Sequence, residues 1–265
     1  MASGAVVDRR RSEGVTPREE RRSPNLLLSV IMPAYNEAAT IETSLRRIRE
    51  VPLRLEIIVV NDASSDGTRE ILDGLATQGL VDRVMHHEKN RGKGAAIRTG
   101  IAVAGGDAVV VQDADLEYDP QDLPALLLPL RARQADAVYG SRFQGGPHRV
   151  LYFWHTVGNR FLTLLSNMFT NLNLTDLETC YKLVRTDLIK KLPLSSNRFG
   201  FEVEITARLA QARARVWELP ISYSGRTYAE GKKITWRDGF AALFHILRYN
   251  LFVPRNIAEW RLPAK

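Results

Sequence analysis

The first half of the chain alternates apolar, strand-like segments with helix-like segments. A chain that repeats strand, helix and strand in this way folds into a mostly parallel sheet with helices on both faces. Ligands of such sheets bind at the carboxyl ends of the strands, so we expect the functional residues in the segments that follow strands. The strand-like segments are residues 26–32, 55–60, 81–86 and 108–111, and the helix-like segments are residues 41–48, 68–75, 95–103 and 123–130.

Size and cysteine content limit the class of protein. The chain has 265 residues, of which 45% are hydrophobic and 25% are charged, which suits one core and a small appendage. We predict a flexible charged tail at residues 1–25, one compact domain at residues 26–235, and an amphipathic helix and tail at residues 236–265. The tail has no apolar run, so we expect neither a signal peptide nor an anchor there. The single cysteine, Cys180, excludes an internal disulfide and a Cys-rich zinc site and indicates a reducing compartment, the cytoplasm.

The net charge of +7 is concentrated at the two ends of the chain. Residues 1–25 hold six basic and four acidic groups, and residues 226–265 hold eight basic and three acidic groups. Residues 26–225 are therefore neutral overall. A nucleic-acid-binding protein more often spreads basic charge along a face with interleaved aromatic residues. We therefore expect no nucleic-acid partner, and an anionic surface or phosphate near the C-terminal end.

Three carboxylates follow the apolar run 109–111 at alternate positions: Asp113, Asp115 and Glu117. They would project to one side if the extended geometry continued past the strand, because side chains alternate along a strand. Carboxylates that lie close together repel one another unless a cation lies between them. Mg²⁺ or Mn²⁺ would suit this set and would share its ligands with phosphate oxygens of a substrate. The alternative is a solvated acidic turn before a helix that starts at Asp119.

Two further segments after strands carry groups suited to a nucleoside. Residues 33–37 and 61–68 combine hydrogen-bonding groups with an aromatic side chain, without the glycine spacing of a dinucleotide fingerprint or a P-loop. For Asp62 and Glu37 we favour ligand contact. For Asn36 and Asp66 helix capping is at least as good an explanation.

A short basic segment, Asn90-Arg91-Gly92-Lys93-Gly94, lies between a predicted strand and a predicted helix. Its glycines allow close approach of the backbone, and a lysine near a helix N-terminus suits an anion. A single Gly-x-Gly is weak evidence, and it gains weight from the neighbouring segments.

Taken in order, these segments resemble the family-2 glycosyltransferases with the GT-A fold, a Rossmann-like α/β fold. The match is closest to the polyprenyl-phosphate and dolichyl-phosphate sugar synthases, and it covers residues 26 to about 250. The ordered set is specific, although each segment alone is not. The matching segments are residues 33–37, 61–68, 90–94, 113–116, 140–142, 175–182, 199–202 and 226–233.

The resemblance implies a role for each matching residue. The nucleotide sugar would be bound by Pro33, Tyr35, Glu37, Asp62, Lys93, Asp113 and Ala114. The metal ligands would be Asp115 and Glu117, the latter where the mannose branch often has glutamine. Arg142 would bind the acceptor phosphate, with an ion pair to a carboxylate as the alternative, and Arg226 and Lys232 would close over the diphosphate, with a solvated basic loop as the alternative. Asp115, Arg142, Arg226 and Lys232 form the predicted catalytic set.

The acceptor decides the mechanism. A phosphate monoester has a second pKa of about 6, so it is already anionic at neutral pH and needs no general base. The resemblance therefore implies an inverting transfer of glucose or mannose, from UDP-glucose or GDP-mannose, to a polyprenyl phosphate, with UDP-glucose weakly favoured. A hydroxyl acceptor would need a base, for which Asp176, Glu202 and Glu204 are candidates. The third alternative is a module that binds nucleotide sugars without turnover.

Two segments offer apolar surface for a lipid. Residues 151–174 are rich in aromatic residues and leucine, and residues 236–253 place Trp236, Phe240 and Phe244 at helical spacing. Neither has the roughly 20 uninterrupted apolar residues that cross a bilayer. We expect interfacial helices and a peripheral protein at the cytoplasmic face of a membrane. The alternative is that both segments simply pack on the sheet.

Overall fold

The computed structural model describes residues 26–150, 152–198, 200–227, 236–254, 257 and 260. The predicted tail at residues 1–25 and the predicted catalytic Lys232 lie outside the described residues.

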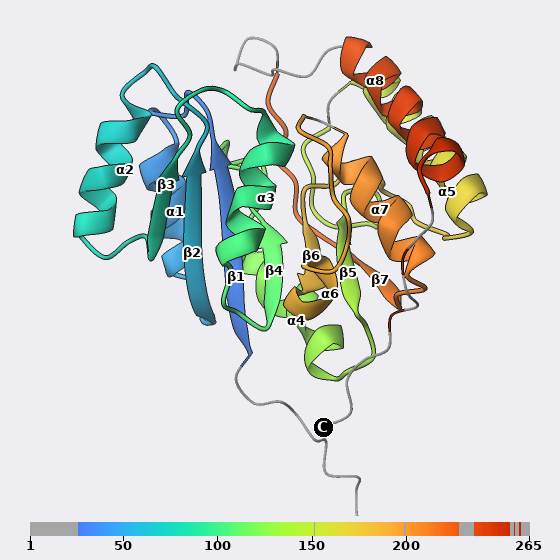
Figure 1. The fold of residues 1–265 in the computed structure, drawn as a ribbon, viewed down its shortest axis with the longest axis horizontal. Coiled ribbons are helices and arrows are strands. Elements are labelled where there is room, and N and C mark those ends of the chain that lie inside the picture. Colours follow the sequence, from blue (N-terminus) through green and yellow to red (C-terminus); the bar gives the residue numbers. More distant parts are fainter. Residues whose placement is uncertain are drawn as a thin grey trace, which may run out of the picture.

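The alternation predicted for the first half is confirmed (Figure 1). Apolar spacing explains these elements: the first helix buries Ile41, Leu45 and Ile48 on one face, and the strand at residues 108–111 is buried on both faces. The elements are β1 (Leu27–Ala34), α1 (Ile41–Arg49), β2 (Arg54–Asn61), α2 (Thr68–Thr77), β3 (Arg83–His86), α3 (Lys93–Val103), β4 (Ala108–Val111), a 3₁₀ turn (Pro120–Asp122) and α4 (Leu123–Arg131).

The second half completes the sheet and adds a helical layer beyond it. Its strands are β5 (Ala137–Ser141), β6 (Lys182–Arg185) and β7 (Val216–Pro220). Its helices are α5 (Phe153–Thr170), α6 (Thr186–Ile189), α7 (Phe201–Gln211) and α8 (Trp236–Leu247), and α8 continues as a π-helix (Arg248–Phe252).

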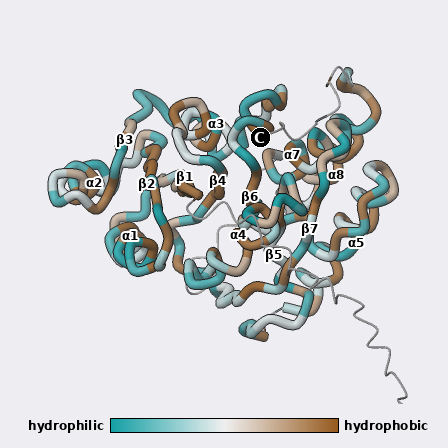
Figure 2. Tube along the Cα trace, turned by 90° about the horizontal axis from the view of Figure 1, so that it is seen from below, coloured by the Kyte–Doolittle hydropathy of each residue, from teal (hydrophilic) through white to brown (hydrophobic). Residues whose placement is uncertain are grey.

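The seven strands form one sheet in the order β3-β2-β1-β4-β6-β5-β7. β6 is antiparallel to both neighbours and the other pairs are parallel, as predicted for a mostly parallel sheet. Helices α3 and α7 cover one face, and α1 and α4 cover the other (Figures 1 and 2). The register pairs Ala34 with Asn61 and Ile31 with Val111, so β1, β2 and β4 end at the same edge. This edge gathers the segments in which we expect the site.

Helices α5 and α8 pack against α7 and against each other around a second, small apolar cluster (Figure 1). Leu177, Val203, Ala242 and Ile246 form this cluster, separate from the main core. Within the ranges that the structure describes, no helix is both long and apolar enough to cross a membrane.

Candidate active site

Asp115 and Glu117, which follow β4, contact the same guanidinium, but the extended geometry by which we predicted their proximity is wrong. The chain turns at Ala114 and Asp115, and Leu116 has a φ of 64°, so the extended geometry ends before Glu117. One guanidinium joins two of the acids instead. Arg226 places Nη2 3.0 Å from Asp115 Oδ2 and Nε 3.2 Å from Glu117 Oε1, and its backbone N–H donates to Glu117 Oε1 at 3.0 Å.

Negative charge is crowded at this turn, and the raised pKa of Asp115 reflects it. Burial and the charges of Asp113 and Glu117 raise the pKa of Asp115 to about 7, against the opposing effect of Arg226. The side chains of Asp115 and Glu117 are 18% and 11% exposed, which does not fit the alternative of a solvated acidic turn. The site therefore attracts cations, and Arg226 supplies one in this structure.

The donor set fits a hard divalent cation. Mg²⁺ is usually bound by one or two carboxylates together with phosphate oxygens of a substrate, and Asp115 and Glu117 offer such a pair. Among the residues that the structure describes, no group of three or more His, Cys, Asp or Glu side chains is arranged to hold a metal ion.

Tyr223 belongs to this cluster, but it was not predicted from the sequence. The one sequence signal for it is its position three residues before Arg226. Its hydroxyl donates to Glu117 Oε2 at 2.7 Å. Burial and the charge of Glu117 raise the pKa of Tyr223, so the hydroxyl remains protonated.

Lys93, at the start of α3, forms ion pairs with two acids at the site. Its Nζ lies 3.0 Å from Asp113 Oδ2 and 3.1 Å from Glu202 Oε1. Burial alone would lower the pKa of Lys93, but Asp113 and Glu202 outweigh it and raise the pKa well above its ordinary value. Lys93 therefore holds the turn after β4 against the first turn of α7. Ala114, which follows Asp113, is buried.

Asp62, at the end of β2, is buried and fixes the turn before α3. Its carboxylate accepts from the backbone N–H groups of Arg91 at 2.9 Å and Gly92 at 2.7 Å, and His87 Nδ1 lies 2.6 Å from Asp62 Oδ1. These contacts explain why an acid is needed at this position. The nucleoside-binding role of Asp62 remains a prediction.

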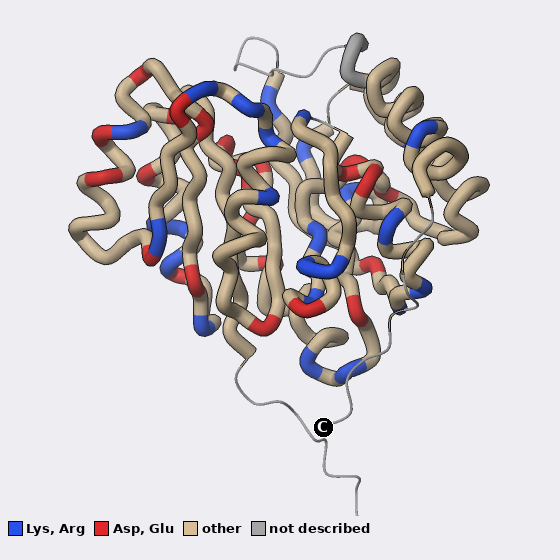
Figure 3. The backbone as a smooth tube through the Cα atoms, viewed as in Figure 1, with Lys and Arg blue, Asp and Glu red and all other residues tan. Residues whose placement is uncertain are grey.

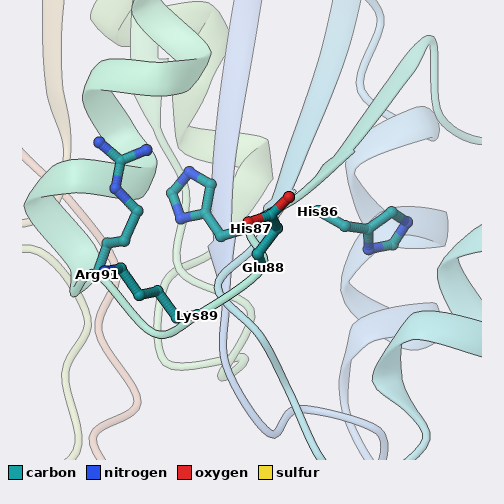
Figure 4. A pocket seen from close by; sticks show the side chains of 5 residues that line it. All are labelled: His86, His87, Glu88, Lys89 and Arg91. Carbon is teal, nitrogen blue, oxygen red and sulfur yellow. The ribbon is translucent and has the colours of Figure 1, made fainter.

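A hollow of about 340 Å³ lies beside Asp62 at this edge of the sheet, and Figure 4 shows the side chains around it. Its lining includes two cationic side chains, Lys89 and Arg91. The side chain of His86 points away from that of His87, and its Nε2 lies 3.0 Å from Asp73 Oδ1 on α2. The lining residues are His86, His87, Glu88, Lys89 and Arg91.

The loops after β1 and β2 are bonded to each other. Asn36 Oδ1 accepts from the backbone of Ser65 at 2.8 Å. Asp66 accepts from the backbone N–H groups of Ala38 at 3.0 Å and Thr68 at 3.1 Å, so it satisfies the first N–H of α2, although the N-cap residue itself is Gly67. The helix-capping explanation is wrong for Asn36, because this side chain joins the two loops instead.

The other three predicted nucleoside contacts lie on or after β1. Pro33 is part of β1, Tyr35 is 46% exposed, and the Glu37 carboxylate accepts from the Thr40 hydroxyl at 2.9 Å. They lie at the sheet edge where Asp62 lies, because β1 and β2 end together. Their contact with a nucleoside remains a prediction.

The glycines of the Gly-x-Gly segment are needed for contact within the chain. A Cβ on Gly94 would lie 2.5 Å from the carbonyl oxygen of Ser196, and Gly92 has a φ of +94° and the backbone of Asn197 beside it. Close backbone approach is therefore confirmed, but the partner is the segment before α7.

We expect Gly94→Ala to lower the free energy of unfolding by about 1–3 kcal/mol, because the backbone of Ser196 must move. The matched control is Gly74→Ala, since Gly74 lies inside α2 and a Cβ added there would meet nothing within 4 Å. That change should raise the same free energy by about 0.5–1 kcal/mol. Urea unfolding measures both, and equal effects of the two substitutions would contradict the packing contact.

Arg142, directly after β5, forms an ion pair in this structure. Its Nε lies 2.7 Å from Asp176 Oδ2 and its Nη2 lies 2.8 Å from Asp176 Oδ1, and Asp176 is fully buried. The alternative for Arg142, an ion pair with a carboxylate, is therefore what the structure shows. Its Cζ also lies 5.2 Å from the centre of the Tyr223 ring. Phosphate binding by Arg142 remains a prediction.

The three candidate bases for a hydroxyl acceptor all have partners. Asp176 pairs with Arg142, and Glu202 pairs with Lys93 through Oε1, whereas its buried Oε2 has no hydrogen-bond partner among the described residues. Glu204 accepts from the backbone N–H groups of Ser195 and Ser196 at 2.7–2.9 Å.

Glu178 lies between β5 and β6 in the sequence and is buried, so its ionised form lowers the stability of the folded protein. Its buried Oε1 has no hydrogen-bond partner among the described residues. Burial and the neighbouring charge of Glu202 raise the pKa of Glu178 to about 7, against the opposing effect of Lys182.

This pKa predicts how stability changes with pH. The folded protein holds the Glu178 proton up to about pH 7, whereas the unfolded chain releases it near its ordinary value. Stability due to this group is therefore lost as pH rises from about 4.5 to 7. We expect Glu178→Gln to be more stable than the wild type at pH 8, by about 1–3 kcal/mol, with the difference shrinking toward pH 5.

Urea unfolding at pH 5, 6, 7 and 8 measures this difference. Glu42→Gln is the control, because Glu42 is half exposed on α1 and should give a difference below about 0.5 kcal/mol at every pH. A Glu178→Gln difference that does not change with pH would contradict the raised pKa.

The fold and this edge match a known family. The model for glycosyl transferase family 2 matches residues 29–193. The chain is 33% identical over 244 residues to an undecaprenyl-phosphate mannosyltransferase of Micrococcus luteus, covering 89% of this chain and 94% of that protein. It is 30% identical over 236 residues to a polyprenol monophosphomannose synthase of Mycolicibacterium smegmatis, covering 85% and 87%.

Solved structures agree on the fold. Glucosyl-3-phosphoglycerate synthase from Mycobacterium tuberculosis, in complex with Mn²⁺, uridine diphosphate and glucosyl-3-phosphoglycerate, superposes with a TM-score of 0.66 at 21% identity, covering 85% of this chain and 80% of that chain. The chain belongs to glycosyl transferase family 2, and it is a glycosyltransferase with a GT-A-like α/β fold.

Proposed function

We propose that this glycosyltransferase moves a hexose from a nucleotide sugar to a polyprenyl phosphate, with inversion and with Mg²⁺ or Mn²⁺. Support for this acceptor comes from the names of two relatives. The Micrococcus luteus protein is named for undecaprenyl phosphate, and the Mycolicibacterium smegmatis protein is named for polyprenol monophosphomannose. The same names favour mannose over glucose, so we propose GDP-mannose as the donor, in place of the weak sequence preference for UDP-glucose.

The observation that carries the choice of acceptor is that Asp176, Glu202 and Glu204 already have partners. A hydroxyl acceptor needs a base to take its proton, and each of these acids has an ion pair or hydrogen bonds within the protein. A phosphate acceptor is already anionic at neutral pH and needs none.

In the proposed reaction a phosphate oxygen attacks the anomeric carbon from the face opposite the nucleotide. The bond from that carbon to the diphosphate oxygen breaks, and the diphosphate leaves with the electron pair. Inversion of an alpha-linked donor gives a beta-linked sugar phosphate, without a covalent enzyme intermediate. Arg142 would orient the attacking phosphate through two parallel hydrogen bonds.

The donor would lie along the carboxyl ends of β1, β2 and β4. Asp115 and Glu117 would hold the divalent cation, which when bound offsets charge on the leaving diphosphate. Arg226 pairs with the same two acids in this structure, so it would have to be released from them when the cation binds. Once released, it would face the diphosphate and stabilise the developing charge.

The lipid would approach along α5 and α8. Apolar side chains on these helices and on the following π-helix point outward, and we call them the outward apolar face. On α5 the polar Thr163 and Ser166 are buried and Leu162, Leu165 and Phe169 pack partly on the second apolar cluster, while other apolar side chains are exposed. The face consists of Phe153, Trp154, Val157, Phe161, Leu164, Met168, Phe240, Phe244, Leu251 and Phe252.

This exposure goes against the alternative that both helices only pack on the sheet. Trp154 is 76% exposed and Phe252 is 77% exposed. Helices α5 and α8 lie side by side, and within residues 153–170 and 239–247 only Arg160 carries a charge (Figure 3). Large exposed apolar patches mark interaction surfaces. We propose that the outward apolar face rests on the cytoplasmic surface of a membrane.

We expect the double variant Trp154→Glu, Phe244→Glu to bind vesicles of phosphatidylcholine and phosphatidylglycerol at least about tenfold more weakly, because two large apolar side chains no longer enter the lipid. Leu128→Glu is the matched control, because Leu128 is 58% exposed but lies on α4. Co-sedimentation measures binding. Equal binding by the double variant and the control would contradict the membrane contact.

Product mass spectrometry tests the proposed reaction. Purified protein is incubated with Mg²⁺ or Mn²⁺, a short polyprenyl phosphate and either GDP-mannose or UDP-glucose in separate tubes. We expect a metal-dependent hexosyl polyprenyl phosphate with GDP-mannose. Hydrolysis of the donor with no lipid product would contradict the acceptor and leave the family assignment intact.

A further inference from the structure

Tyr223 lies between the donor side and the acceptor side of the candidate site. Its backbone is fixed, because its N–H donates to the carbonyl of Pro147 at 2.9 Å and its carbonyl accepts from Arg149 N–H at 2.9 Å. Its ring packs edge-on against the buried ring of Tyr118, with centroids 5.3 Å apart. The side chain is therefore held in one position by groups outside the proposed chemistry.

This side chain contacts two functional candidates, Glu117 and Arg142, and its hydroxyl interacts with both. The hydroxyl donates to Glu117 Oε2 at 2.7 Å, while Glu117 Oε1 faces Arg226. The ring lies 5.2 Å from Cζ of Arg142, whose guanidinium also pairs with Asp176. One rigid side chain therefore contacts both the candidate metal ligand and the candidate phosphate ligand.

Each contact can fix the orientation of its partner. A hydrogen bond to an ionised carboxylate is short, strong and directional, and such bonds orient carboxylates that bind metals. The face of an aromatic ring attracts a guanidinium and limits the positions it can adopt. Because a tyrosine ring is rigid, the positions of Glu117 and Arg142 are linked through it.

We propose that Tyr223 is a positioning residue, which orients Glu117 through its hydroxyl and Arg142 through its ring, and so aligns the donor with the acceptor phosphate. This inference rests on the proposed function. Phenylalanine keeps the ring and loses the hydroxyl, whereas leucine loses both, so the two variants isolate the contribution of the ring.

The test compares Tyr223→Phe and Tyr223→Leu in two measurements. Mn²⁺ binding is titrated by electron paramagnetic resonance in the presence of GDP or, separately, UDP, and KM is measured for a short polyprenyl phosphate. Both variants should bind Mn²⁺ about tenfold more weakly, because each lacks the bond to Glu117. Tyr223→Leu should raise the acceptor KM by about fivefold and Tyr223→Phe by less, because only leucine lacks the ring that faces Arg142, while both lack the hydroxyl that also interacts with it.

Tyr139→Phe is the matched control. The hydroxyl of Tyr139 is buried and bonds to that of Thr206 at 2.9 Å, away from Glu117 and Arg142. This variant loses a buried tyrosine hydroxyl, and we expect a lower melting temperature with unchanged Mn²⁺ affinity and acceptor KM.

Three outcomes would overturn the inference. Wild-type Mn²⁺ affinity in Tyr223→Phe would exclude the role of the hydroxyl, and wild-type acceptor KM in Tyr223→Leu would exclude the role of the ring. Parallel changes of both quantities in both variants, in proportion to lost stability, would indicate a merely structural tyrosine. Failure of the wild type to form a lipid product would contradict the proposed function instead, and the Mn²⁺ titration would still decide the role of the hydroxyl.

Discussion

Asp115→Asn should lower kcat for hexosyl transfer about a thousandfold while the protein remains folded. Asp115 is one of two carboxylates that face Arg226, and it lies where Asp113 and Glu117 add further negative charge. Asparagine keeps the shape of the side chain and removes the charge that would hold the cation. It also removes repulsion, so we expect no loss of stability at pH 8. Steady-state kinetics and urea unfolding at that pH measure the two effects.

The matched control is Asp119→Asn, the same substitution four residues further along. Asp119 is 39% exposed, pairs with Arg47 at 3.3 Å, and caps the following 3₁₀ turn through Gln121 N–H, a contact that asparagine can also make. We expect activity within about twofold of the wild type. Near-normal activity of Asp115→Asn would exclude Asp115 from the proposed catalytic set.

Arg142→Lys should raise KM for the polyprenyl phosphate about a hundredfold, with a smaller effect on KM for the nucleotide sugar. Arginine binds a phosphate through two parallel hydrogen bonds, and lysine offers only a point charge. Lysine can still neutralise the buried Asp176, whereas alanine would leave that acid unpaired at a cost of about 3–5 kcal/mol. Initial rates at varied acceptor concentrations, with saturating donor, measure the effect.

Arg215→Lys provides a closely matched control. Arg215 bonds Asp136 as Arg142 bonds Asp176, through Nε at 2.9 Å, Nη2 at 2.8 Å and its backbone N–H at 2.9 Å. Asp136 precedes β5, whereas Arg142 follows it, so the two pairs lie at opposite ends of one strand. We expect Arg215→Lys to affect stability and to leave both KM values unchanged. An equal rise of acceptor KM in both variants would show that Arg142 acts only through folding.

The first half of the fold could be predicted because the spacing of apolar residues along the sequence agrees there with the residues that the structure buries. Each strand at residues 27–34, 54–61 and 108–111 contains an apolar run, and helices α1 and α2 each bury an apolar face. The antiparallel strand β6 could not be predicted, because its four residues, Lys182–Arg185, show no clear period and depend on pairing with β4 and β5. Its direction is a tertiary property.

The candidate site was predicted in part, for a similar reason. Motif positions identified Asp115, Glu117 and Arg226, and the structure brings them together across more than 100 residues. Leu116, with its positive φ, overturned the extended geometry by which we explained the carboxylates. Tyr223 was missed, because its contacts with Glu117 and Arg142 join segments that only the folded sheet edge places side by side.

The central claim is that the acceptor is a phosphate and needs no base. The most direct measurement offers the enzyme a polyprenyl phosphate and the corresponding polyprenol in one tube, with GDP-mannose and Mg²⁺, and quantifies both products by mass spectrometry. We expect hexosyl polyprenyl phosphate and no hexosyl polyprenol. Transfer to the alcohol would show that a base is present, and would contradict the assignment of Asp176, Glu202 and Glu204 to structural contacts alone.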